Sequence, residues 1–423
     1  MDSDGEALAL LRGYVRLRSV NPRFQGGGDG EAAMADRVEA DLRAVGLEVE
    51  RLEVEPGRPN LIATLHGSGG GPRLLFNAHL DTVPARDGED WIDPETGSTL
   101  TRWTVDPFAG EVRGGMLVAR GAADHKLPLA ALVVALRRLR AQGWRPRGDL
   151  LVICDADEET GGAAGMRHIA RTRDLAVDAA LYGCTTDFTE LAQGYFPALG
   201  RHNVIRALSG SDRYCLHLAG ESYHSLTPRD GRNAIEAFMA VAPLLERWAA
   251  AVNAEVNPVV GRGKPRARVV NVRTDLRAAH RAAEVCEVDI TRRIDPGEDA
   301  DAAFAELAAL VAPHRLERTA HLPWHETPAE PAGTDAGGRA WMGWAAAAAC
   351  LAVSEEPARV TGLPAPVGLS QLLAERPMPA VLFAFGSVNY HHALDERVPV
   401  AAAGMTARAY AQILRGYLGS AGV

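Results

Sequence analysis

The sequence has few cysteines and no long apolar run. Only five of its 423 residues are cysteine, and these are scattered, odd in number and without a Cys-X-X-Cys pair. Their placement argues against a disulfide framework and against a zinc site made of cysteines alone. No apolar segment approaches the ~20 residues that a membrane helix needs. The first residues, MDSDGEALALLRGY, lack the basic region and apolar core of a secretory signal. We therefore expect a cytoplasmic protein with no membrane partner.

Positive charge is also in short supply. The 45 Lys and Arg residues are outnumbered by 54 Asp and Glu residues, which gives a net charge of −9. Binding to a nucleic-acid backbone requires a basic surface, so we expect no nucleic-acid partner. A hydrophobic fraction of 47% with 23% charged residues is typical of a globular protein. The length indicates two or three domains with at least one large core.

Helical and extended patterns alternate through the first half of the chain. Residues 31–45 and 127–143 have the spacing of amphipathic or buried helices, and the apolar runs at 73–80, 149–157 and 179–184 predict buried strands. This alternation is typical of an α/β fold with a mainly parallel sheet.

A second pattern, strand–helix–strand–helix, occupies residues 209–320. It fits a small α+β sandwich with its own core. The α/β pattern resumes after residue 320. We therefore predict one larger α/β domain formed by residues 1–208 and 321–423, with a smaller domain inserted at 209–320.

Polar residues follow several of the apolar strands, where open α/β sheets bind their ligands. His79 and Asp81 come at the end of the strand RLLFNA. At positions i and i+2 of an extended segment they point the same way, so the carboxylate can orient the imidazole toward a metal. A histidine that is merely hydrogen-bonded at a strand end is the alternative. Asp124, which precedes the helix 127–143, is either a helix cap or a metal ligand.

Two adjacent carboxylates, Glu158 and Glu159, follow the strand DLLVIC. Burying such a pair is costly unless a positive charge lies close by. A divalent cation provides it: one carboxylate binds the cation and the other takes a proton from water. A solvated loop is the alternative. Near the C-terminus, HHALDERV adds His391 and His392 after another apolar strand, and one of the two is expected to be a ligand. Together these residue types are the ligands of a hydrolytic zinc site.

The motifs resemble the co-catalytic zinc aminoacylase, desuccinylase and carboxypeptidase family (metallopeptidase family twenty). The resemblance rests on NAHLDTVP, DPFAGEVRGGMLVARGAADHK, DEETGG, GESYHSLTPRDGRNAIEAF and HHALDERV, and it covers almost the whole chain. Members include acetylornithine deacetylase, succinyl-diaminopimelate desuccinylase and glutamate carboxypeptidase. The resemblance implies a zinc-peptidase-like catalytic domain, an inserted lid and dimerisation domain that forms a homodimer, and a small N-acyl amino acid or peptide as the substrate.

By position, the resemblance implies one or two zinc ions, or cobalt or manganese in their place. Asp124 corresponds to a carboxylate that bridges both ions, Glu158 to the general base and Asp81 to the carboxylate that orients a ligand. The remaining metal ligands correspond to His79, Glu159 and His392. In the inserted domain, His224 corresponds to a histidine that stabilises the oxyanion in the partner subunit's site, and Arg293 to an arginine that binds a substrate carboxylate. His280 stands in place of a family asparagine.

The sequence departs from the family at one expected ligand. Cys184, in LYGCTTD, stands where the family has a carboxylate. A thiolate binds Zn²⁺ well, so Cys184 is a candidate third ligand beside His79 and Asp124. It can also be a residue that lines the site without binding metal, or a core residue. The further alternatives are a single-metal site of Asp124, Glu159 and His392, or a role for Asp187.

The substrate-recognition motifs also depart from the family. Lys126-Leu127-Pro128 replaces lysine-glycine-glycine, so we expect unusual substrate recognition. The main hypothesis is a metallohydrolase that cleaves an amide bond in an N-acyl amino acid or small peptide. An enzyme that forms or cyclises amides or transfers an acyl group is the second hypothesis, and a catalytically silent binding protein is the third.

Overall fold

The computed structural model describes residues 3–24, 27–85, 91–92, 99–188, 201–221, 223–224, 233–261, 265–274, 282–327 and 342–420. The chain divides into two compact units. The first contains Met1–Arg206, Glu326–Thr361 and Gln371–Val423, and the second contains Ala207–His325 and Gly362–Ser370. The predicted domain limits of 1–208, 209–320 and 321–423 stay a prediction.

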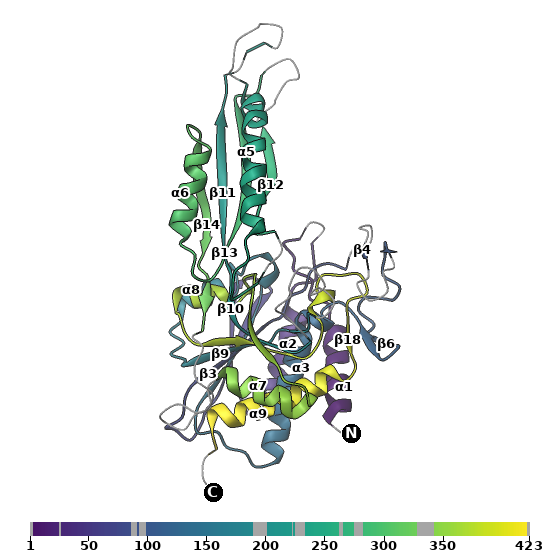
Figure 1. The fold of residues 1–423 in the computed structure, drawn as a ribbon. Helices are drawn as coiled ribbons and strands as arrows, with labels where there is room; N and C mark the ends of the chain where they lie inside the picture. The colour runs from purple at the N-terminus through teal and green to yellow at the C-terminus, as the bar shows by residue number, and fades with distance from the viewer. Residues whose placement is uncertain are drawn as a thin grey trace. The chain divides into compact units, whose positions relative to one another are not determined.

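The first unit is built on a mixed sheet that has nine strands among the described residues (Figure 1). Its order is β1-β2-β8-β3-β9-β17-β10-β15, and β16 pairs with β10. Strands β8, β3, β9 and β17 run parallel, and antiparallel pairs flank them on both sides. The strands are β1 (Glu48–Glu55), β2 (Arg58–Leu65), β3 (Leu74–His79), β8 (Leu150–Asp155), β9 (Ala179–Tyr182), β10 (Asn203–Leu208), β15 (His325–Glu326), β16 (Arg359–Leu363) and β17 (Ala380–Leu382).

The central strands are buried along their whole length, and most of their side chains are apolar on both faces. Every residue of β3, β8 and β9 is buried, as in parallel sheets covered by helices on both sides. Helices α1, α3, α7 and α9 pack against one another in one layer (Figure 1). The helices of this unit are α1 (Ser3–Val15), α2 (Ala32–Ala44), α3 (Leu127–Ala141), α4 (Met166–Thr172), α7 (Met342–Ser354) and α9 (Ala402–Leu418), while α8 (Ser370–Glu375) begins at the unit boundary.

Short elements connect the sheet to the candidate site. A small antiparallel sheet joins β6 (Glu111–Arg113), β7 (Met116–Val118) and β18 (Arg397–Pro399), and β4 (Trp91–Ile92) pairs with β5 (Thr99–Leu100). Three short helical turns lie near the strand ends: η1 (Ala122–Lys126) follows β7, η2 (Glu158–Thr160) follows β8, and η3 (Val388–Tyr390) lies between β17 and β18. Because β7 and β18 are paired, the small sheet holds η1, which follows β7, next to the C-terminal segment that contains β18.

The second unit is an antiparallel sheet of order β12-β13-β11-β14 with two helices. Its elements are β11 (Gly210–Ala219), α5 (Ala234–Ala254), β12 (Ala267–Thr274), β13 (Val285–Ile294), α6 (Ala300–Leu310) and β14 (Arg315–Leu322). Alternate residues of β11 and β13, such as Leu216 and Val288, form its core with Leu245, Trp248 and Leu307 of the helices. This is the α+β sandwich that the sequence predicted, with β12 and β14 added.

The predicted fold class is confirmed: an α/β unit with a mixed, mainly parallel sheet, and an antiparallel insert. Strands β1 and β2 form an antiparallel pair at one side of the parallel strands. None of the described helices combines the length and apolar character that crossing a bilayer demands.

Candidate metal centre

The carboxyl ends of the parallel strands bring the predicted site residues together. His79 is the last residue of β3 and pairs in register with Asp155, the last residue of β8. Glu158 and Glu159 follow β8 directly, and Cys184 follows β9, which runs parallel to β3. Parallel strands that end at one edge place these side chains around one point, as ligand sites of α/β sheets require.

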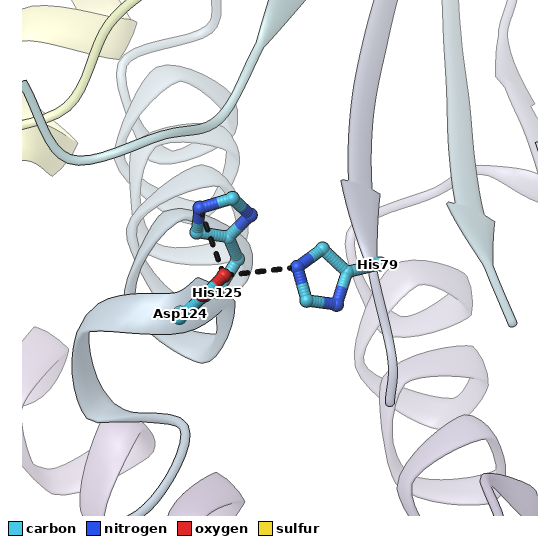
Figure 2. A group of neighbouring side chains, drawn as sticks. All are labelled: His79, Asp124 and His125. Atoms are coloured by element: carbon cyan, nitrogen blue, oxygen red, sulfur yellow. Dashed lines mark hydrogen bonds and ion pairs between the residues drawn. The ribbon is translucent and has the colours of Figure 1, made fainter. Parts of the chain in front are cut away.

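The carboxylate of Asp124, in η1, lies at the centre of the cluster. Its Oδ1 is 3.1 Å from Nε2 of His79 and 3.1 Å from Nε2 of His125 (Figure 2). Its Oδ2 is 3.1 Å from Nε2 of His392 and 3.4 Å from Nδ1 of His391. Each oxygen therefore faces a different pair of imidazoles, which is the geometry of a carboxylate that bridges two cations.

Two groups of side chains around Asp124 have the spacing of metal ligands. One consists of His79, Asp124 and His125, and the other of Asp124, Glu159 and His392; within each group the ligand atoms lie within 4.8 Å of one another. Oε2 of Glu159 is 3.0 Å from Nε2 of His392. In a tetrahedral zinc site with bonds of about 2.1 Å, neighbouring ligand atoms are about 3.4 Å apart. Distances of 3.0–3.1 Å are close to this value.

Several buried polar atoms at the cluster have no hydrogen-bond partner among the described residues. They are Oε1 of Glu159, the hydroxyl of Tyr182 and both ring nitrogens of His125. Leaving such an atom unpaired costs about 1–3 kcal/mol. A cation bound between them would satisfy part of this requirement, so the donor set fits a divalent metal.

Burial and mutual charge shift the pKa values of the cluster. Burial raises the pKa of Glu158 to about 8; His79 opposes this rise, and Glu159 and Asp124 add to it. Burial likewise raises the pKa of Glu159, with Asp124 adding to the rise. Burial lowers the pKa of His392, but hydrogen bonds to Asp124 and Glu159 outweigh this effect and raise it to about 11. The cluster therefore holds protons that a bound cation must displace.

Asp81 supports the site through both its main chain and its side chain. Nδ1 of His79 lies 2.9 Å from the main-chain oxygen of Asp81 and 3.5 Å from Oδ1 of that residue. This contact turns Nε2 of His79 toward Asp124. The carboxylate of Asp81 accepts hydrogen bonds from the main-chain amides of Glu158 (3.1 Å) and Glu159 (3.2 Å), and from Asn21 (2.7 Å). Asp81 thus fixes the histidine and the glutamate pair together.

Glu396, in the motif HHALDERV, binds a neighbouring arginine and several main-chain amides. Glu396 is fully buried and accepts hydrogen bonds from Arg120 (2.7 Å) and from the main-chain amides of Gly121, Ala123 and Asp124 (3.0, 2.7 and 3.1 Å). These bonds hold η1 against the segment that carries His392. The sequence motif contained Glu396, but nothing in the sequence identified its partners.

Backbone strain is concentrated beside the same residues. Asp157, directly before Glu158, has a φ of 63°, and His392 itself has a φ of 63°. Residues other than glycine in this left-handed region cost about 1–3 kcal/mol and occur most often at functional sites. Both consecutive histidines, His391 and His392, lie close to Asp124, whereas the sequence led us to expect only one histidine ligand there. The left-handed φ of His392 is part of this arrangement.

The remaining predicted residues are placed as follows. Cys184 is buried, its Sγ donates to the main-chain oxygen of Thr185 at 3.4 Å, and it belongs to neither ligand group. Burial raises the pKa of its thiol, and Asp124 adds to this effect. His224 and Arg293 belong to the second unit, and His280 lies outside the described residues. Their roles stay predictions.

A mainly parallel sheet that gathers carboxylates and imidazoles at its strand ends, with an antiparallel insert, is the arrangement expected of a metallopeptidase family. The chain belongs to peptidase family M20/M25/M40, whose model matches residues 75–416. The family resemblance seen in the sequence is therefore confirmed.

Three known proteins illustrate the similarity. A succinyl-diaminopimelate desuccinylase of Stenotrophomonas maltophilia is 31% identical over 369 residues, which are 85% of this chain and 87% of the relative. The solved structure of the di-peptidase Dug1p of Saccharomyces cerevisiae has a TM-score of 0.67 at 14% identity, covering 99% of this chain and 97% of that one. The YXEP protein of Bacillus subtilis, described as a dinuclear metal-binding peptidase, has a TM-score of 0.65 at 14% identity and covers 99% of both chains. The two structures share the fold of this protein.

We predict that zinc uptake at pH 7 releases at least two protons per chain, those of His79 and His392. Burial opposes the rise, but hydrogen bonds to neighbouring carboxylates raise the pKa of His79 well above its ordinary value and that of His392 to about 11, and both imidazoles must be neutral to act as ligands. Titration calorimetry in buffers of different ionisation enthalpy measures the number released. The exposed His66 provides a control, because His66→Gln should leave the number unchanged, whereas His392→Ala should lower it by about one. A binding enthalpy that does not depend on the buffer contradicts the prediction.

We predict that Glu396→Gln lowers the free energy of unfolding by about 3 kcal/mol, because it leaves the buried guanidinium of Arg120 without its carboxylate. Urea unfolding of the metal-free protein measures this difference. The exposed pair Arg171–Glu375 is a matched control, and Glu375→Gln should cost less than about 1 kcal/mol. Equal losses in the two variants would show that Glu396 does not hold η1 in place.

Proposed function

We propose that this protein is a metal-dependent hydrolase that cleaves the amide bond of an N-acyl amino acid or small peptide. The observation that carries the proposal is the position of Asp124, whose two oxygens face two groups of ligands, with Glu158 beside them. The adjacent carboxylates Glu158 and Glu159, whose pKa values are raised by desolvation, argue against a silent binding protein, because two such groups side by side are costly without a cation.

The proposed metal ions are zinc, with cobalt or manganese as substitutes, held by His79, Asp124, Glu159 and His392. When bound, they supply a Lewis acid that polarises the amide carbonyl and lowers the pKa of water. Glu158 belongs to neither ligand group, so its carboxylate is free of a ligand's role. It takes the proton from the water whose oxygen adds to the carbonyl carbon. As the C–N bond breaks, Glu158 passes that proton to the leaving nitrogen.

Residues of the second unit complete the proposal. In a dimer, His224 of one copy would donate a hydrogen bond to the oxyanion in the other copy's site, and Arg293 would bind a substrate carboxylate through two parallel bonds. His280 is a further candidate for substrate binding. These three roles rest on the family resemblance. The relatives are a desuccinylase and a di-peptidase, whose names support a substrate that contains an amide next to a carboxylate. A cytoplasmic location and the absence of a nucleic-acid partner stay predictions from the sequence.

We further propose a homodimer formed through the second unit. Strand β12 is at one edge of its sheet, and its side chains from Arg268 to Thr274 are exposed. Three of them are valines, Val269, Val270 and Val272. An exposed strand edge with apolar side chains tends to pair with another chain. A second copy of this edge is the partner that we propose.

We predict that Glu158→Gln lowers kcat by about 10²–10⁴-fold while the zinc content stays at the wild-type level. The substitution removes the base but none of the proposed ligands. Turnover of N-succinyl and N-acetyl amino acids and of dipeptides is measured beside metal analysis. Glu48→Gln, on the exposed face of β1, is the control and should retain full activity. Wild-type turnover by the zinc-loaded Glu158→Gln variant would rule out Glu158 as the base.

We predict that Val270→Lys converts the dimer to a monomer, because it places a charge in the proposed contact of β12. Light scattering after size-exclusion chromatography measures the mass. Val112→Lys, at an exposed valine of the first unit, is the matched control and should remain dimeric. A monomeric wild-type protein, or a Val270→Lys variant that stays dimeric, contradicts the proposed interface.

A further inference from the structure

His125 is a buried polar residue that the proposed mechanism leaves without a role. It is 5% exposed, and neither ring nitrogen has a hydrogen-bond partner among the described residues. Its ring packs against the rings of His79 (4.6 Å between centroids), His391 (5.3 Å) and Tyr182 (5.4 Å). A side chain with two unpaired nitrogens at this depth is costly unless something in the site binds one of them.

The geometry around His125 is that of a metal ligand. Its Nε2 lies 3.1 Å from Oδ1 of Asp124, but the two atoms lack the alignment of a hydrogen bond. The same oxygen lies 3.1 Å from Nε2 of His79 (Figure 2). Two imidazole nitrogens and a carboxylate oxygen at such distances can share one tetrahedral cation, since the expected separation of the ligand atoms is about 3.4 Å.

The local backbone explains how two consecutive residues reach one point. Within η1, Asp124 (φ −126°, ψ 92°) and His125 (φ −131°, ψ 45°) leave the helical conformation. Glu396 binds the main-chain amides of Ala123 and Asp124 and fixes this bend. The chain returns to helical dihedrals at Lys126, whose Nζ is anchored on the main-chain oxygen of Leu17 at 2.6 Å.

The thiol of Cys184 is arranged differently. Its Sγ donates to the main-chain oxygen of Thr185 and lies outside both ligand groups. We propose that His125, and not Cys184, is the third protein ligand of the cation that His79 and Asp124 hold. This inference rests on the proposed function, because it concerns the same metal centre.

The proposed ligand set has a chemical consequence. Two neutral imidazoles and one shared carboxylate give the cation less negative charge than a set that includes a thiolate or a second carboxylate. The cation therefore stays a stronger Lewis acid. A set of nitrogen and oxygen donors also accepts cobalt and manganese, whereas a thiolate favours zinc.

X-ray absorption at the zinc edge of the zinc-loaded wild-type protein tests the proposal without any substitution. We expect nitrogen and oxygen neighbours at about 2.0–2.1 Å with imidazole scattering, and no sulfur neighbour at about 2.3 Å. The cobalt-loaded protein should lack the near-ultraviolet charge-transfer band of a thiolate ligand.

Two substitutions distinguish the residues. His125→Asn, which shortens the side chain, should reduce the zinc content from two ions per chain to one. Loss of a residue that only supports a ligand lowers metal affinity roughly 10–100-fold. His125→Asn should lower the affinity for the lost ion by more than this. Cys184→Ala should retain both ions. Circular dichroism checks that each variant is folded.

The outcomes separate this inference from the proposed function. A sulfur neighbour that disappears in Cys184→Ala, with both ions retained in His125→Asn, overturns the role of His125 and leaves the metallohydrolase proposal standing. A wild-type protein that binds no zinc overturns both.

Discussion

The site depends on the contacts that the carboxylate of Asp124 makes with the surrounding imidazoles. Four imidazoles lie within 3.4 Å of its two oxygens, two on each side. A carboxylate shared in this way couples two ligand groups, so each group is correctly spaced only while Asp124 keeps its place. The sheet provides that arrangement, because β3 and β8 run parallel and end at the same edge, and His79 at the end of β3 contacts Asp124.

Much of the surrounding structure holds this carboxylate in position. Glu396 accepts hydrogen bonds from the main-chain amides of Asp124 and of the residues just before it, and Asp81 joins His79 to the glutamate pair. Both are buried charges whose hydrogen bonds are directed to backbone as well as to side chains. A buried carboxylate with several donors stabilises one arrangement strongly and leaves an unpaired group if it is removed. The left-handed residues Asp157 and His392 show that the arrangement is maintained against local strain.

The sequence predicted the order of elements well, because the strands at the centre are continuous apolar runs and the helices begin and end near recognisable residues. It missed β12 and β14, whose many exposed or charged side chains, as in RLERTAHL, resemble loop sequence. It grouped His79, Asp124, Glu159 and His392 because polar residues at strand ends converge. His125 was missed because the direction of its side chain depends on a non-helical bend inside η1, which no periodicity reveals, although its position next to Asp124 was a signal.

Diffraction at wavelengths on either side of the zinc edge, from crystals of the zinc-loaded protein, measures the central claim most directly. The account predicts two anomalous peaks per chain, about 3.5–4 Å apart, one on each side of the carboxylate of Asp124. A single peak that contacts only one oxygen of Asp124, or peaks remote from it, would contradict a site in which this carboxylate is shared.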